Sequence, residues 1–346
     1  MSGQSITLCV FYQSSQKAIG EVVLKKLLSL LILALKLLFG FVLSVIIILM
    51  FLGGIRYVIQ YNATPPFQMV AVEGERRLHS TCAGPEDAPF VLYDAGAFGN
   101  YTDGWWVMEA LREDHRVCIY DRAGMGWSDP VPAGVSPDPD WHVEDMRRLR
   151  AALGQDTPYV LIGHSMSGLR LHAYANSYPE ELRGLVFVDA ARPQDLKFER
   201  IRSIRPWLER AMTLSTFFAR IGVNGGAAYF ISDDLDHTGQ RSKDKRRTLS
   251  SVQHQKATKA EITAAFEAFP NASWRVETNA EQIPVFVFTN VNGDSNAPVA
   301  RAALQNTGLG GITVLPEATH VSLLNEDNAK LIARDVRKIT DQKRDD

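Results

Sequence analysis

A run of nineteen residues without a charge, from Leu37 to Ile55, most restricts what this 346-residue chain can fold into. As an α-helix rising about 1.5 Å per residue, the run would be roughly 28 Å long, which matches the hydrocarbon thickness of a bilayer. It is longer than the apolar part of a cleaved signal peptide, and no clear small-x-small cleavage site follows it. It also lacks the polar face of a helix packed on a soluble domain. We therefore expect a transmembrane helix over residues 37–55.

The charges on either side of this run predict its orientation. Four lysines precede it, whereas a single arginine, Arg56, follows within about twenty residues. The excess of positive charge keeps the N-terminal side in the cytoplasm. We expect a cytoplasmic segment over residues 1–36, a single pass through the lipid bilayer, and a catalytic domain on the extracytoplasmic side. The four lysines are Lys17, Lys25, Lys26 and Lys36.

Composition excludes several classes of partner. The formal net charge is −2, and no long basic run interrupts the chain, so nucleic acid is not an expected partner.

Three cysteines are too few for a disulfide scaffold and lack the paired spacing of a zinc site. If Cys82 and Cys118 fall on neighbouring strands, an oxidising compartment could join them. A pair of buried free thiols is the alternative.

After a linker over residues 56–65, short β-rich runs alternate with helical patterns, which predicts a mostly parallel sheet flanked by helices. This rhythm stops between about residues 192 and 282, where the patterns are helical and no convincing strand occurs. We expect an inserted helical lid there, with a solvated loop over residues 232–250. The expected strands lie in PFQMVAVEGERRLHSTCAG, PFVLYD, RVCIYD, YVLIGH, GLVFVDA, IPVFVFT and GITVL.

The sequence YVLIGHSMSGLRLHAYA joins a strand to a helix at Ser165. A serine at such a sharp turn presents its hydroxyl, as a nucleophile elbow does. The residues two positions to either side must be small, and they are Gly163 and Ser167, the second of which departs from the usual glycine. The G-x-S-x pattern alone is weak, and its position between strand and helix gives it weight.

Together with this elbow, YDAGAFGN after one strand and YDRAGMGWSD after the next resemble the α/β-hydrolase superfamily, from about Pro66 to the C-terminus. The resemblance implies an α/β-hydrolase fold with core segments at 66–191 and 283–346 around the lid at 192–282. It also implies that the backbone N–H groups of Ala97 and Met166 form the oxyanion hole. Phe98 would be the donor if its loop is shifted by one residue. We expect the YDRAGMGWSD loop to be structural, with Asp121 and Arg122 holding it in place.

A serine nucleophile needs a general base and an acid that orients the base. His320 follows the last expected strand, where the family carries its base. We expect His164 to be part of the elbow and the other six histidines to be packing or surface residues. Asp294, in VNGDSN after the strand IPVFVFT, is the preferred acid. Asp189, which ends GLVFVDA, is the alternative. The predicted catalytic triad is therefore Ser165, Asp294 and His320.

This chemistry requires no metal and no cofactor. It predicts hydrolysis of a carboxylic ester or related acyl bond of a small molecule through an acyl-enzyme. Apolar lid residues and the membrane anchor favour a lipophilic substrate, and Phe98, Trp207 and Phe217 are the candidate pocket residues. An aspartate at the elbow would have indicated epoxide or haloalkane hydrolysis. An acyltransferase, an amide or carbon–carbon hydrolase, and a non-catalytic binding module remain alternatives, and the oligomeric state is open.

Overall fold

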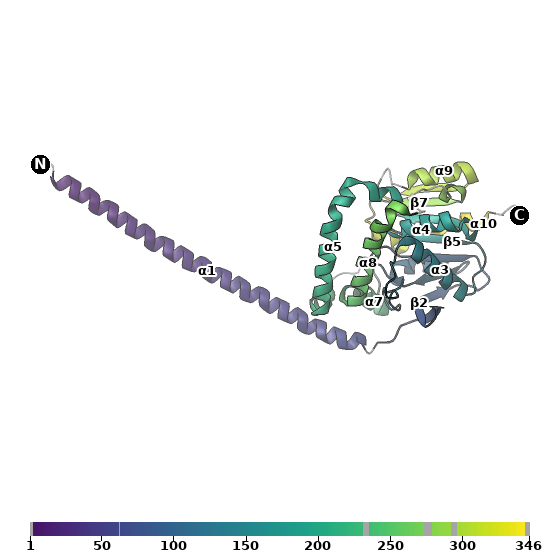
Figure 1. The fold of residues 1–346 in the computed structure, drawn as a ribbon, viewed down its shortest axis with the longest axis horizontal. Helices are drawn as coiled ribbons and strands as arrows, with labels where there is room; N and C mark the ends of the chain where they lie inside the picture. Colours follow the sequence, from purple (N-terminus) through teal and green to yellow (C-terminus); the bar gives the residue numbers. More distant parts are fainter. Residues whose placement is uncertain (1–2, 62, 231–234, 273–278, 292–295, 343–346) are drawn as a thin grey trace.

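The computed structural model describes residues 3–61, 63–230, 235–272, 279–291 and 296–342. A long N-terminal helix projects from a compact α/β domain (Figure 1). The helix, α1, runs without interruption from Gly3 to Tyr61. Within it, Val23–Ile59 is long and apolar enough to cross a membrane by length and composition. Most of the expected linker at 56–65 is therefore helical, because the apolar pattern continues past Arg56 to Ile59.

Eight strands form one sheet in the order β1-β2-β4-β3-β5-β6-β7-β8. Strand β2 is antiparallel to β1 and β4, and every other pair is parallel. All the strands expected from the sequence are present. Their bounds are Gln68–Glu73 (β1), Arg76–Ala83 (β2), Phe90–Asp94 (β3), Arg116–Tyr120 (β4), Tyr159–His164 (β5), Leu182–Val188 (β6), Val285–Thr289 (β7) and Gly310–Val314 (β8).

Helices cover both faces of the sheet because the central strands carry apolar side chains on both sides. On β3, Leu92 packs in the cluster formed with α3, α4 and α9, whereas Val91 and Tyr93 pack in the cluster formed with α2 and α10. All three side chains are buried. The helices are Trp105–Leu111 (α2), Pro139–Ala152 (α3), Ser167–Ser177 (α4), Ala297–Thr307 (α9) and Glu326–Asp341 (α10).

The chain between β6 and β7 is helical in its described parts, as the sequence predicts. Four α-helices lie there, and α5 and α8 pack against each other. The prediction of a loop over residues 232–250 is wrong from Gly239 onward, because α7 forms there. This helix buries Asp244, which accepts a hydrogen bond from Tyr101 at 2.7 Å. The helices are Glu199–Arg220 (α5), Val223–Ala227 (α6), Gly239–Ser250 (α7) and Val252–Ala268 (α8).

A disulfide joins Cys82 of β2 to Cys118 of β4, which are directly opposite each other in the antiparallel pair, with Cα atoms 4.1 Å apart. The conditional prediction that these two cysteines pair on neighbouring strands is confirmed. The bond ties the N-terminal hairpin, formed by β1 and β2, to the parallel part of the sheet.

Candidate active site

Ser165 occupies the turn between β5 and α4 in a left-handed backbone conformation, with φ of 54°. Its N–H donates to the carbonyl of Val188 at 3.1 Å, and its carbonyl accepts from Ala191 at 2.7 Å. The turn is therefore fixed to the end of the neighbouring strand β6. A non-glycine residue at positive φ is strained, and such strain gathers at functional sites. Ser165 has the geometry of a nucleophile elbow.

The small neighbours of Ser165 are required by close packing. A Cβ at Gly163 would lie 2.5 Å from Leu171, and a Cβ at Gly168 would lie 2.1 Å from the carbonyl oxygen of Ala191. Ser167, the departure from the family pattern, is fully buried and donates a hydrogen bond to the carboxylate of Asp94. The hydroxyl of Ser167 therefore makes a hydrogen bond that a glycine at this position could not make.

His320 follows β8 and faces the end of β6. Its Nδ1 lies 2.5 Å from Oδ2 of Asp189, the alternative acid, and Asp189 also has a positive φ, of 40°. The preferred acid, Asp294, lies outside the described residues. The structure thus brings Asp189 to His320. Both side chains remain partly accessible, at 22% for Asp189 and 48% for His320.

His320 is also held beside the elbow by His164. Their ring centroids are 4.5 Å apart, and Nε2 of His164 lies 2.9 Å from the backbone oxygen of His320. Burial, together with the nearby His320, lowers the pKa of His164 to about 4, so it is neutral at pH 7 and donates to that oxygen. Among the described residues, Ser165 and His320 share no hydrogen bond, and such bonds are often loose without substrate.

The loop after β3 lies against Ser165. A Cβ at Gly96 would be 2.7 Å from Cβ of Ser165, and the N–H of Gly99 closes a turn onto the carbonyl of Gly96 at 3.1 Å. Phe98 in this turn has φ of 60° and is 40% exposed. Within the described part of the chain, the N–H groups of Ala97 and Met166 form no hydrogen bond with a backbone carbonyl. The expected role of Ala97, or of Phe98, in an oxyanion hole stays a prediction.

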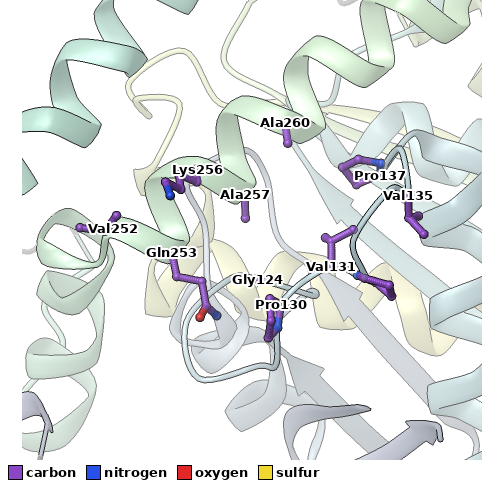
Figure 2. Close-up of a pocket in the computed structure, with 11 residues that line it drawn as sticks. Gly124, Pro130, Val131, Val135, Pro137, Val252, Gln253, Lys256, Ala257 and Ala260 are labelled. Atoms are coloured by element: carbon purple, nitrogen blue, oxygen red, sulfur yellow. The ribbon is translucent and has the colours of Figure 1, made fainter. Parts of the chain in front are cut away.

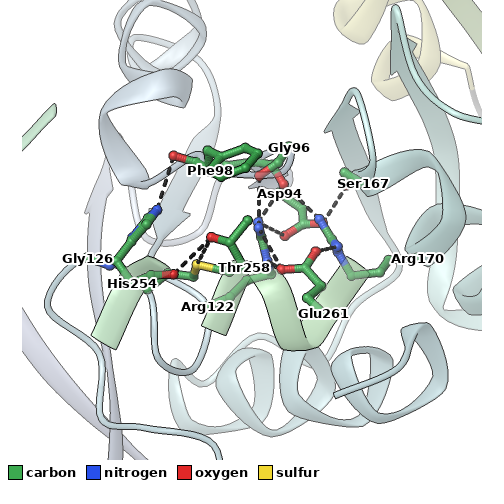
Figure 3. Close-up of polar contacts among 12 residues, drawn as sticks. Asp94, Gly96, Phe98, Arg122, Gly126, Ser167, Arg170, His254, Thr258 and Glu261 are labelled. Atoms are coloured by element: carbon green, nitrogen blue, oxygen red, sulfur yellow. Dashed lines mark hydrogen bonds and ion pairs between the residues drawn. The ribbon is translucent and has the colours of Figure 1, made fainter. Parts of the chain in front are cut away.

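A buried cluster of four charges supports this loop from below (Figure 3). The guanidinium groups of Arg122 and Arg170 both donate to the carbonyl of Ala95, and Arg122 also donates to that of Gly96. Asp94 and Glu261 neutralise the two arginines. Although burial alone would raise it, these arginines hold the pKa of Asp94 down to about 2 and also lower that of Glu261.

Glu261 is on α8, so this cluster connects the helical insertion to the loop beside Ser165. His254 of the same helix contacts the loop as well: its Nε2 lies 3.2 Å from the carbonyl oxygen of Phe98, while its Nδ1 accepts from Gly126 at 3.1 Å. The expected structural role of the Tyr120–Asp129 loop is consistent with these contacts. Asp121, for example, accepts from the N–H groups of Tyr101 and Trp127.

A prominent pocket lies away from Ser165. It has a volume of about 560 Å³ and is a mainly apolar groove between the loop after β4 and the first half of α8 (Figure 2). Ser165 and His320 do not line it. Trp207 and Phe217, two candidate pocket residues, are 75% and 52% exposed on α5, so their exposure gives no support to that role. No group of three potential metal ligands occurs among the described residues.

Residues 95–323 match the family model for the alpha/beta hydrolase fold, which is most of the chain. The chain belongs to the alpha/beta hydrolase family. The elbow, the strand order and the histidine after β8 all agree with this assignment.

Individual relatives are similar to this chain over limited segments. An uncharacterized protein of Schizosaccharomyces pombe is 42% identical over 26% of this chain and 17% of its own length. Methylesterase 1 of Arabidopsis thaliana is 30% identical over 30% of this chain and 40% of its own length. The chain thus spans less than half the length of either relative. A thermophilic esterase from Thermogutta terrifontis shares the fold, with a TM-score of 0.52, 20% identity, and coverage of 79% of this chain and 97% of the esterase.

Proposed function

We propose that this protein is a serine hydrolase that cleaves a carboxylic ester or related acyl bond, with Ser165 as nucleophile, His320 as general base and Asp189 as the orienting acid. The contact between His320 and Asp189 beside the strained turn at Ser165 carries this proposal. Asp294, the acid expected from the sequence, is the alternative for the third role.

In the proposed reaction, Oγ of Ser165 attacks the acyl carbonyl while Nε2 of His320 takes its proton. The negative charge of Asp189 stabilises the imidazolium that forms, and its hydrogen bond with Nδ1 leaves Nε2 free to accept. The protonated His320 then gives its proton to the leaving group. Water, activated by the same histidine, hydrolyses the acyl-enzyme and restores Ser165.

The proposed oxyanion hole consists of the N–H groups of Ala97 and Met166, with Phe98 as the alternative first donor. The close approach of Gly96 to Ser165 supports a location within reach of the tetrahedral intermediate. Arg122 and Arg170 fix the carbonyls of the preceding two residues, so the loop would not have to reorganise during reaction. Preorganised donors of this kind supply a large part of catalysis in acyl transfer.

We further propose that α1 anchors the enzyme in a bilayer with the N-terminus in the cytoplasm and the catalytic domain outside it. The apolar length of α1 supports the anchor, and the four lysines that precede the uncharged run within this helix support the orientation. The disulfide between Cys82 and Cys118 adds support, because such bonds persist mainly in oxidising compartments. A membrane location favours a small lipophilic substrate that partitions near the anchor.

The similarity to methylesterase 1 supports ester hydrolysis as the first reaction to test. Transfer of the acyl group to another alcohol or amine would use the same groups, as would amide or carbon–carbon cleavage. A non-catalytic binding module is disfavoured because the chain carries a candidate nucleophile, base and acid, of which His320 and Asp189 are in contact.

The test is hydrolysis of p-nitrophenyl esters of increasing acyl length by the purified full-length protein. Ser165→Ala should abolish activity, and Asp189→Asn should lower kcat by about 10³- to 10⁴-fold, because the histidine loses its orienting charge. Asp294→Asn is the matched control and should remain within a few-fold of wild type. A large loss in Asp294→Asn with an active Asp189→Asn would reverse the acid assignment, while activity retained in Ser165→Ala would refute the serine mechanism.

A further inference from the structure

Helix α5 carries an exposed apolar face that the packing of the domain leaves uncovered. Ile204, Trp207, Leu214 and Phe217 are all at least half exposed, and Trp207 is 75% exposed. Their spacing of three and seven residues places them along one broad side of the helix. The opposite side is buried on the domain through Met212 and Ala219. Large apolar residues gathered on one exposed face indicate a partner surface.

The position of this helix relative to α1 is fixed by contact between glycine backbones. A Cβ at Gly53 of α1 would lie 1.8 Å from the carbonyl oxygen of Gly222, and a Cβ at Gly226 would lie 2.2 Å from that of Leu49. Gly222 follows the last residue of α5, Arg220, by two positions. The C-terminal end of α5 is therefore held against α1 near Leu49 and Gly53 (Figure 1).

This contact point lies near the C-terminal end of the uncharged run within the apolar segment Val23–Ile59. Lys36 and Arg56 bracket its nineteen uncharged residues, and Gly53 is two residues before the end at Ile55. At about 1.5 Å per residue, Gly53 lies roughly 3 Å and Leu49 roughly 9 Å inside that end. With α1 across a bilayer, the end of α5 would thus lie at the boundary between hydrocarbon and headgroups, which is the depth of an interfacial amphipathic helix.

The side chains of α5 fit that depth. Trp207 has the amphipathic ring that membrane interfaces favour. Arg202, Arg210 and Arg220 are exposed beside the apolar face, where anionic headgroups would lie. In Figure 1, the lower end of α5 lies beside α1, and α5 runs from there along the side of the domain that faces α1.

We propose that α5 lies in the interfacial layer of the same bilayer that α1 spans, with Trp207, Leu214 and Phe217 in contact with lipid. This inference rests on the proposed membrane anchor and adds a second membrane contact to it. The contact assigns Trp207 and Phe217 to lipid rather than to an acyl pocket.

The test uses the full-length Cys9→Ser protein, which keeps the disulfide and lacks the third cysteine. Leu214→Cys is labelled with an environment-sensitive fluorophore and reconstituted into vesicles of phosphatidylcholine and phosphatidylglycerol with brominated acyl chains. Ile47→Cys in α1 reports on the anchor, and Leu304→Cys, 46% exposed on α9, is the matched surface control. Phe217→Cys replaces Leu214→Cys if that variant does not fold.

We expect bromine quenching at Leu214 of about twofold, below that at Ile47 and well above that at Leu304, as a depth of 5–10 Å implies. Quenching at Ile47 with none at Leu214 would overturn the proposal and leave the anchor intact. No quenching at either position would overturn both. A Leu214 label shielded from aqueous iodide but not quenched by brominated lipid would assign the face to a protein partner, which also overturns the proposal.

Discussion

Replacing Glu261 by glutamine should destabilise the catalytic domain strongly. The side chain is 3% exposed, and its carboxylate contacts Arg122 at 3.2 Å and also pairs with Arg170. Without it, one buried carboxylate, Asp94, remains for two buried guanidinium groups. Removing one partner of a buried ion pair typically costs about 3–5 kcal/mol. Glutamine keeps the volume and a hydrogen-bonding oxygen, so we expect the lower end, about 3 kcal/mol.

The same helix offers a matched control. Glu267 of α8 is 65% exposed and lies 3.4 Å from Arg205, so Glu267→Gln should change stability by no more than about 0.5 kcal/mol. At about 2–4 °C per kcal/mol for a domain of this size, Glu261→Gln should lower the melting temperature by roughly 6–12 °C. Thermal denaturation of the detergent-solubilised full-length proteins at pH 7 measures both.

The pH dependence gives a second check. The pKa values of Asp94 and Glu261 are lower in the folded protein, so their contribution to stability is present above their unfolded values near 4 and is lost as pH falls toward 2. The difference in melting temperature between wild type and Glu261→Gln should therefore shrink below about pH 4. Equal melting temperatures for Glu261→Gln and Glu267→Gln at pH 7 would refute the view that this cluster is a stabilising unit.

Two further changes test the site and the sheet. Gly96→Ala should lower kcat/KM for a p-nitrophenyl ester by about 10²-fold or more. The new Cβ would lie 2.7 Å from Cβ of Ser165 and displace the loop that carries the proposed oxyanion hole. Unchanged kinetics would show that this loop is not part of the active site. Cys82→Ser with Cys118→Ser should cost about 4 kcal/mol, given a separation of 36 residues, and a melting temperature unaffected by the double change or by reductant would show that the bond contributes nothing to stability.

The sheet was predictable because each strand is a short β-rich run bounded by glycine, proline or aspartate. The elbow was equally readable, since the change from strand to helix falls at Ser165 itself. Helix α7 was missed because its sequence is strongly polar and has little apolar periodicity. Its position depends instead on tertiary contacts such as that between Asp244 and Tyr101, 143 residues apart in the chain.

The supporting cluster could not have been found from the sequence. Glu261 is separated from Arg170 by 91 residues and from Arg122 by 139, and nothing local distinguishes it from an exposed helical glutamate such as Glu267. The choice of acid was likewise beyond the sequence, because Asp189 and Asp294 each follow a neighbouring strand of the sheet. The contact between His320 and Asp189 supports Asp189, whereas Asp294 lies outside the described residues.

The glycine contact between α1 and α6 makes the N-terminal helix part of the packing of the domain as well as a membrane anchor. If a flexible linker joined the helix to the domain, the distance between the active site and the membrane could vary widely. Here the backbones at Gly53 and Gly222 meet without intervening side chains, so the helix packs directly on the domain. Cutting the chain at Tyr61 would then do more than release a soluble enzyme, since it would strip α6 of its partner and expose a glycine-lined surface to water.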